Sequence, residues 1–413
     1  MRIGCVALAT FLCCALAQAQ NEVAPSVLLL ARIKLRMAEN LDRLPNYTCV
    51  ETIERSQRIK PSRKFQLRDL LRLEVALVEG KELFAWPGAG KFEEWELGKV
   101  FQTGAIANGD FAQHVRAVFL ARGPTFEYRG DEVQGGRKTE RYDFTVPQYL
   151  SGWSIKVGEN KAMVGYSGSF WADAESLDLV RLDLRADDLP PILSLDEVRD
   201  TLEYARVRIG DAGFLLPATS ELVMTYLDGN ESRNRIAFNN CRQFAGESVL
   251  TFGEAPASSA PGAGVTEVRL PDNLMFEFEL ATAVDAAKSA IGDPIQATLL
   301  RAVKKGDQTV APKGAILRAR LAKVEKMGFA RPAYLISLEP VTLEFGNVRA
   351  RFFARLEAVG PFFGTAGQAK VELGRENAPG RGEFWIMSGQ SLALPRGTRM
   401  VWRTFPKGTE EKK

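Results

Sequence analysis

The sequence predicts a mainly β protein, in which a leading amphipathic helix precedes a large curved antiparallel sheet (an open barrel) and a smaller β-barrel or sandwich domain follows. Three observations support this fold class. Apolar residues recur at steps of three and four near the N-terminus, they alternate with polar residues over most of the remaining chain, and short Gly- and Asp-containing connections separate the alternating runs. A chain of 413 residues also exceeds what one hydrophobic core usually organises, so we expect two domains.

The first nineteen residues have the pattern of a secretory leader. Arg2 precedes an apolar run over residues 5–16, and Ala17, Gln18 and Ala19 form a small-residue cleavage site. We therefore expect a periplasmic or secreted protein. No later segment approaches the roughly 20 apolar residues that a membrane span needs, so no transmembrane segment is expected in the mature chain.

Residues 25–44 follow, with the period of an amphipathic helix. Pro25 suits a first helical turn, and Pro45 ends the pattern. The apolar positions that define the predicted buried face are Val27, Leu30, Ile33, Met37, Leu41 and Leu44. Because the polar face carries both signs of charge, packing on a sheet is favoured over binding to a membrane surface.

Beyond Pro45 the period changes to two. Strand candidates cover residues 48–55, 71–77, 141–146, 153–157, 163–166, 169–171, 177–185, 201–209, 214–216, 221–227, 235–238 and 248–252. The polar connections at residues 158–160, 210–213 and 228–230 are of hairpin type, so neighbouring strands should pair antiparallel. One further helix is predicted at residues 110–120. His114 lies in it either as a pH-sensitive or catalytic residue or as a surface residue without a special role, and the second interpretation is favoured because no partner motif accompanies it.

Residues 254–264 read EAPASSAPGAG, the composition of a flexible connector. The predicted domain organisation is therefore a leader at 1–19, a curved-sheet domain at 20–253, a linker at 254–264, a C-terminal β-domain at 265–406 and a charged tail at 407–413. In the C-terminal domain, residues 268–280 are predicted to form one strand-like run.

Composition argues against most enzyme classes. After the leader the chain keeps one histidine, His114, and two cysteines, which is too few for a zinc site and leaves one possible base for a serine triad. With 54 basic and 51 acidic residues, no strong field attracts nucleic acid. We expect no catalytic residues, no cofactor and no metal, although a carboxylate pair of the glycosidase kind is not excluded by composition.

Cys49 and Cys241 are expected to form a disulfide. Both lie in strand-like segments of one predicted domain, and export to an oxidising compartment permits the bond. In the chain-entropy model, closing so long a loop contributes roughly 4 to 5 kcal/mol. The alternative is two buried, unpaired thiols.

Three aromatic residues, Trp153, Phe170 and Trp171, are candidates for lining a lipophilic pocket. Aromatic side chains in strands more often form core, so that interpretation stays open.

Two stretches resemble known families. The segments LPNYTC (44–49), GSFWAD (168–173), LLP (215–217) and 234–244 resemble uncharacterised exported proteins of acidobacterial type, and the leading helix with its meander is similar to the open barrel of LolA, LolB and RseB-like proteins. The segments at 270–271, 283–285, 291–295 and 310–315 resemble the C-terminal β-domain of TrbI-type proteins. The first resemblance is one of pattern, which implies the open-barrel fold and carries no specific functional motif, and the second lies in turn residues and implies a shared β-domain fold.

These observations lead to three functional hypotheses. The first is an exported, non-enzymatic binding protein of the bacterial envelope that holds a lipid or a lipidated partner against the leading helix. The second is a scaffold that binds envelope proteins through exposed strand edges. The third is a carbohydrate-active enzyme that uses two carboxylates.

Overall fold

The structure is a computed structural model that describes residues 23–79, 81–89, 91–95, 105–107, 113–244, 266–285, 288–327, 333–360, 370–375, 377–387 and 393–406. The predicted leader (1–19), strand at 248–252, linker (254–264) and charged tail (407–413) lie outside these residues.

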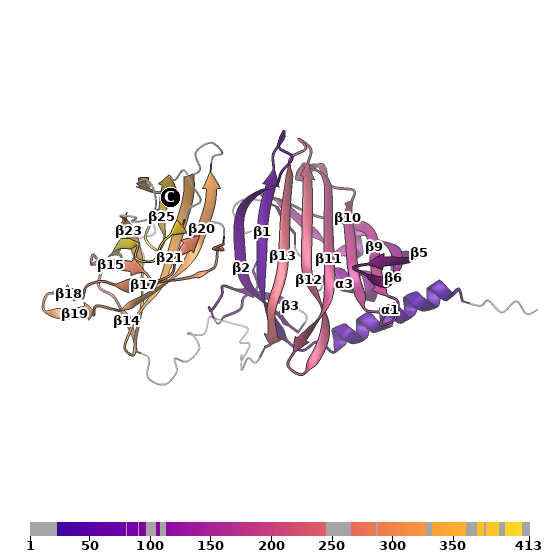
Figure 1. Ribbon diagram of the computed structural model, residues 1–413, viewed down its shortest axis with the longest axis horizontal. Coiled ribbons are helices and arrows are strands. Elements are labelled where there is room, and N and C mark those ends of the chain that lie inside the picture. The colour runs from indigo at the N-terminus through magenta and orange to yellow at the C-terminus, as the bar shows by residue number, and fades with distance from the viewer. Residues whose placement is uncertain are drawn as a thin grey trace, which may run out of the picture.

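The predicted curved antiparallel sheet is confirmed. A ten-stranded sheet, which we call the large sheet, has the order β3-β2-β1-β13-β12-β11-β10-β9-β6-β5 and curls into a half-barrel (Figure 1). Its strands are β1 (Tyr47–Arg58), β2 (Gln66–Val78), β3 (Lys81–Ala85), β5 (Thr125–Gln134), β6 (Arg137–Val146), β9 (Gly165–Asp173), β10 (Leu179–Asp187), β11 (Leu195–Ile209), β12 (Ala212–Tyr226) and β13 (Glu231–Gln243).

The turns that connect these strands explain the meander. Gly210 and Gly229 have φ values of 60° and 76°, a left-handed conformation that glycine adopts at little cost, and they close the β11–β12 and β12–β13 hairpins. Gly158 does the same between β7 (Ser154–Val157) and β8 (Asn160–Met163), which form a small sheet with β4 (Ala105–Ala107).

The leading helix is confirmed as α1 (Pro25–Asp42), and it buries Ile33, Met37 and Leu41. The second predicted helix is described in part: α3 (Gln113–Val115) continues directly into η1 (Arg116–Leu120), a π-helical turn that the sequence did not indicate. Two single turns, α4 (Gln148–Ser151) and η2 (Pro191–Leu193), are the other helical elements among the described residues.

The large sheet is apolar on its concave face and polar on its convex face. Side chains on the concave face form apolar rows across neighbouring strands, as in the register partners Tyr142, Phe170, Leu182 and Leu202. The residues between them along each strand point to the convex face and carry charged and hydroxyl side chains. The concave core has two parts, one under α1 and α3–η1 and one around the β1–β2–β13 strands.

The C-terminal part forms a second sheet with the order β14-β22-β21-β20-β17-β15-β27-β23, and β25 joins β21 to β24. Its strands are β14 (Thr266–Arg269), β15 (Met275–Leu280), β17 (Pro294–Leu299), β20 (Ile316–Met327), β21 (Ala333–Phe345), β22 (Val348–Arg351), β23 (Ala354–Val359), β24 (Lys370–Leu373), β25 (Gly382–Met387) and β27 (Arg399–Thr404). Two short ribbons pair β16 (Val284–Asp285) with β26 (Ala393–Leu394) and β18 (Val303–Lys305) with β19 (Gln308–Ala311).

One strand prediction in this part is wrong. Residues 268–280 do not form a single strand, because Pro271 has no N–H to donate and Asn273 has a φ of 61°. β14 therefore separates from β15 and pairs in parallel with β22 at the edge of the second sheet.

The two sheets are joined along residues 70–72 of β2, which lie beyond the stretch of β2 that pairs with β3. The Arg72 N–H donates to the Ile291 carbonyl at 2.8 Å, and the Ile291 N–H donates to the Leu70 carbonyl at 2.7 Å. Arg72 also forms an ion pair with Asp293, and the Arg320 guanidinium lies 4.0 Å from the ring centre of Trp86. The contact covers backbone groups that would otherwise remain unpaired at a sheet edge.

Candidate functional site

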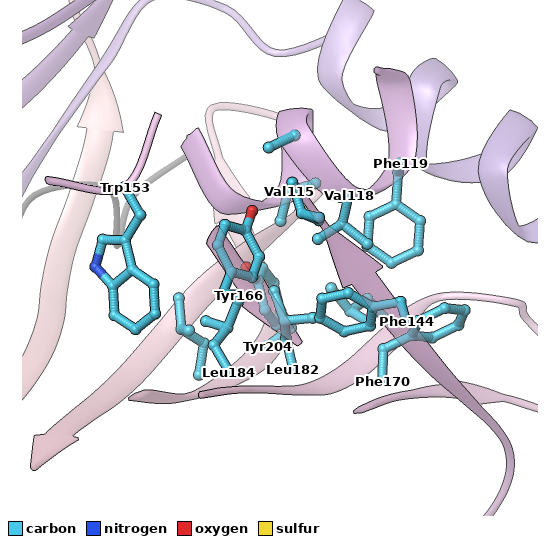
Figure 2. Packing of buried hydrophobic residues seen from close by; sticks show 14 of the residues in the cluster. Val115, Val118, Phe119, Phe144, Trp153, Tyr166, Phe170, Leu182, Leu184 and Tyr204 are labelled. Carbon is cyan, nitrogen blue, oxygen red and sulfur yellow. The ribbon is translucent and has the colours of Figure 1, made fainter. Parts of the chain in front are cut away.

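The floor of the candidate site is the concave face of the large sheet. Strands β6 and β9 contribute the stacked rings of Tyr142 and Phe170, whose centres are 5.2 Å apart, and Phe144 and Tyr166 lie beside them. In Figure 2 the rings of Phe144, Tyr166 and Phe170 lie with Leu182 and Leu184 of β10 beneath a helical segment. The alternation of each strand produces this floor, since every second side chain points to the same face.

Helix α1 is the first part of the cover. Its apolar face packs on the floor, and polar contacts fix it at three points along its length. The Tyr142 hydroxyl donates to the Ser26 carbonyl at 2.6 Å, the Arg36 Nε donates to Asp178 at 3.2 Å, and the Asn40 amide exchanges two hydrogen bonds with the backbone of Leu215. The helix is therefore oriented by side-chain contacts to three different strand regions.

The second part of the cover is the eight-residue segment α3–η1. Its inward side chains include His114, Val118 and Phe119, and the Phe119 ring is 4.9 Å from that of Phe170. The Gln113 amide donates to the Gly152 carbonyl at 2.7 Å, and Gly152 has a φ of 63°, where a Cβ would lie 2.2 Å from the end of the Gln113 side chain and would displace that amide. π-helical turns are frequent at functional sites.

Beneath this segment lies a cluster of polar rings. His114, Trp153 and Tyr166 stand nearly perpendicular to one another with ring centres 5.3 to 5.6 Å apart, and all three are completely buried. The expectation that His114 lies on a helix surface is wrong. The side of α3 that carries His114 packs on the large sheet, and the imidazole points inward between the rings of Trp153 and Tyr166.

Four polar atoms of this cluster have no hydrogen-bond partner among the described residues. They are Nδ1 and Nε2 of His114, Nε1 of Trp153 and the hydroxyl of Tyr166. Leaving one such atom buried and unpaired costs about 1 to 3 kcal/mol. Buried polar atoms in proteins are nearly always paired, so a group of four that lack partners among the described residues marks this cluster as the candidate site.

Asp200 and Ser220 extend the polar cluster. The Ser220 hydroxyl donates to Asp200 Oδ1 at 2.9 Å, and Asp200 Oδ2 lies 3.9 Å from His114 Nε2. Because Ser220 donates to the carboxylate instead of to the imidazole, this is not the order of groups that activates a serine nucleophile.

Burial lowers the pKa of His114 to about 3, so its imidazole is neutral at neutral pH despite the nearby carboxylate. A neutral imidazole offers one hydrogen-bond donor and one acceptor. Together with the donors of Trp153 and Tyr166, the cluster can pair with a carbonyl, hydroxyl or carboxyl group of a ligand.

The structure separates the three aromatic residues that the sequence singled out. Trp153 and Phe170 both belong to the covered core. Trp171 lies on the convex face, between the guanidinium groups of Arg141 and Arg181, and its indole N–H donates to Glu132 at 2.8 Å. Phe170 and Trp171 are consecutive in one strand, so their side chains must point to opposite faces.

Sequence reasoning missed Tyr166 and Asp200 as members of the cluster. The signal for Asp200 was present, because it occupies the same phase as the buried Val198 and Leu202 in β11. A charged residue on the apolar phase of a strand indicates a buried polar site.

The predicted disulfide between Cys49 and Cys241 is confirmed, and it joins β1 to β13 across 192 residues. Glu51, two residues after Cys49 in β1 and on the same face of the sheet, is 5% exposed. Burial, with a smaller contribution from Glu82, raises the pKa of Glu51 to about 8. Since its carboxyl is enclosed, it does not line an open cleft as the paired carboxylates of a glycosidase do.

Over the part of the chain that the structure describes, no three His, Cys, Asp or Glu side chains are grouped closely enough to hold a metal ion. Within the same residues, no helix has the length and apolar character to cross a membrane.

Comparison with known proteins gives two distant structural likenesses. No family model and no curated protein matches the chain. A solved structure described as an outer membrane lipoprotein-sorting protein domain from Vibrio parahaemolyticus is similar at 12% identity and a TM-score of 0.30, covering 53% of this chain and 95% of that one. A DUF1329 family protein from Desulfovibrio piger is similar at 14% identity and the same TM-score, covering 54% of this chain and 95% of its own. Likeness at this level leaves the function to be argued from the residues of this chain.

Proposed function

We propose that this protein is an exported, non-enzymatic binding protein that holds the apolar part of an amphiphilic ligand between the concave face of the large sheet and its helical cover. The polar end of the ligand pairs with His114, Trp153 and Tyr166. The observation that carries this proposal is the group of unpaired, fully buried polar atoms inside an aromatic core.

The chemistry around the cluster supports an amphiphile over a fully polar ligand. A ligand that reaches His114 has to pass the apolar side chains of α1, α3–η1 and the floor, among them Met37, Val118 and Phe170. Burying an apolar chain there is favourable at about 25 cal/mol per Å² of surface removed from water.

Helix α1 also supports uptake of an apolar molecule. It buries Ile33, Met37 and Leu41 and exposes Leu28 and Leu35, at 54% and 61%. Val27, which the sequence placed on the buried face, is also 53% exposed. Exposed apolar side chains beside a covered apolar core provide a surface on which an amphiphile can first adsorb.

The disulfide and the predicted leader support a location outside the cytoplasm. The Cys49–Cys241 disulfide suits an oxidising environment, and the leader predicted at residues 1–19 directs export. We therefore place the protein in the periplasm or outside the cell, where its ligand is a lipid or the lipid part of a lipidated protein.

Binding of 11-(dansylamino)undecanoic acid, a fluorescent amphiphile, tests the proposal. We expect the probe to bind one site on the oxidised protein with enhanced emission, and native mass spectrometry to show one probe per chain. Dodecanoate should displace the probe, whereas hexanoate, with half the apolar chain, should do so far less well.

Phe170→Ala provides the matched structural test, because it removes a floor ring without touching the polar cluster. It should weaken probe binding, whereas the substitution Tyr149→Ala at an 80% exposed site should not. Absence of saturable probe binding to the native protein contradicts the proposal.

A further inference from the structure

The second sheet has a cleft at its edge that the proposed function does not use. It encloses about 640 Å³ between β14, β21, β22 and the residues that follow β27. The cleft lies where β21 changes its partner strand. β25 pairs with β21 up to Leu338, and β22 pairs with β21 from Thr342 onward. The backbone of residues 339–341 is left between the two partner strands, with Val341 half exposed.

One end of the cleft carries two uncompensated positive charges. Arg269 in β14 and Arg351 in β22 are register partners on parallel strands, so their side chains lie next to each other on one face. Neither has an acidic partner or hydrogen bond among the residues described. By contrast, the neighbouring Arg349 and Arg318 both bind Glu344, at 3.2 and 3.1 Å.

Like charges on directly neighbouring strand positions are destabilising, and an anion between them removes that cost. Two guanidinium groups side by side suit a carboxylate, which accepts several hydrogen bonds at once. Glu267, also in the cleft, is the register partner of Arg349 and does not lie between Arg269 and Arg351.

The rest of the cleft is mostly apolar, although Glu339 and Thr342 also line it, and it borders an edge of β14 that has no partner strand among the described residues. Val341, Phe353 and Phe405 line it, and Val268 contributes from β14. β14 is the first strand in the order of the second sheet, and all four of its residues are exposed. The backbone N–H and C=O groups along such an edge can form hydrogen bonds with an extended polypeptide. The hydrocarbon chain of a fatty acid has no groups that can form these bonds.

We propose that this cleft binds the free C-terminus of a partner polypeptide. Its terminal carboxylate lies between Arg269 and Arg351, its last side chain is apolar and contacts Val341, Phe353 and Phe405, and its backbone runs along β14. This inference does not depend on the ligand of the large sheet, because the cleft is built from residues of the second sheet alone.

Fluorescence anisotropy with two hexapeptides tests the proposal on the full oxidised protein. Both carry an N-terminal fluorescein and end in phenylalanine, one as the free acid and the other as the C-terminal amide. We expect the free acid to bind saturably and the amide to bind at least about tenfold more weakly, since a charge-assisted contact is lost.

The double substitution Arg269→Gln and Arg351→Gln should reduce binding of the free acid to the level of the amide. Arg396→Gln is the matched control, because Arg396 is an exposed arginine of the same part of the chain outside the cleft, and it should leave both affinities unchanged. Circular dichroism checks the folding of each variant, and the comparison of acid with amide on the native protein stands without any variant.

Three results would overturn the inference: equal affinities for acid and amide, no saturable binding of either peptide, or displacement of the peptide by dodecanoate at equal concentration. The last would assign the cleft to a fatty acid.

Discussion

At the scale of single residues, the main feature is a buried polar cluster that the described side chains leave without hydrogen-bond partners. His114, Trp153 and Tyr166 are each completely buried, and four of their polar atoms lack partners among the residues described. Such atoms cost stability, and in the proposed function the polar end of the ligand pairs with them.

Two tyrosines of the same core allow this explanation to be tested by substitution. Tyr166→Phe removes an unpaired hydroxyl, so we expect the free energy of unfolding to stay unchanged or to rise by up to about 1 kcal/mol, and amphiphile binding to weaken. Tyr142→Phe removes the hydroxyl that donates to Ser26, so unfolding should become easier by about 1 kcal/mol, with little effect on binding. Urea unfolding and the dansyl probe measure the two effects, and identical behaviour of both variants would argue against a ligand role for Tyr166.

His114 gives a prediction about pH that can be read without ambiguity, because it is the sole histidine of the sequence. Its imidazole signals in NMR should stay constant between pH 8 and 5, since burial lowers the pKa to about 3. The unfolded chain takes up a proton below about pH 6.5, so the unfolded state binds more protons between pH 6.5 and 3, and stability should fall as the pH falls through that window. A titration midpoint near 6.5 would show that the imidazole is exposed to water.

The sequence predicted some of these residues and missed others for a definite reason. Trp153 and Phe170 were identified by residue type, whereas His114 was placed on a surface, because a three-residue helix followed by a π turn has no periodicity from which to infer its buried face. Which atoms remain unpaired depends on contacts between distant strands and is not visible in a linear pattern.

At the scale of elements, helix α1 acts as a cover whose position depends on a few polar contacts. Asn40 is the strongest of these, because its amide both donates to and accepts from the backbone of Leu215. The prediction of this helix and of the hairpins succeeded because periodicity and turn residues are local properties. The separate path of β14 was not predicted, because its partner β22 is distant in the sequence.

Asn40→Ala should therefore loosen the cover. We expect the free energy of unfolding to fall by about 2 kcal/mol, because two hydrogen bonds are lost and a backbone pair is left unsatisfied. Hydrogen exchange should accelerate along α1, and the dansyl probe should associate faster. Glu39→Ala removes only an exposed pair with Arg36 at 3.9 Å and should change stability by no more than about 0.5 kcal/mol. Equal exchange rates in the two variants would mean that Asn40 does not hold the cover.

At the scale of the whole molecule, the two sheets are held together by backbone pairing at the edge of β2. Gly292 lies at the closest point, with a φ of 100° and a position where a Cβ would be 2.3 Å from the Arg72 carbonyl oxygen. The sequence predicted two β units but gave no sign of this junction, since it consists of backbone groups brought together by the completed fold.

Gly292→Ala should separate the two sheets. An added Cβ collides with the backbone of β2, so we expect a larger radius of gyration in small-angle X-ray scattering and faster proteolysis between the sheets. Gly306→Ala is the control for a positive φ alone: its φ of 59° costs alanine roughly 1 to 2 kcal/mol, but its Cβ meets open space. An unchanged radius of gyration in Gly292→Ala would show that this junction does not fix the arrangement.

The central claim, that the polar end of an amphiphile pairs with the buried cluster, is tested most directly by NMR on ¹⁵N-labelled protein titrated with dodecanoate. The ring nitrogens of His114 and the indole N–H of Trp153, assigned with Trp153→Phe, serve as the reporters. We predict saturable shifts of both signals at one dodecanoate per chain, as expected for new hydrogen bonds. Shifts confined to the exposed residues of α1, with both reporters unchanged at saturation, would contradict it.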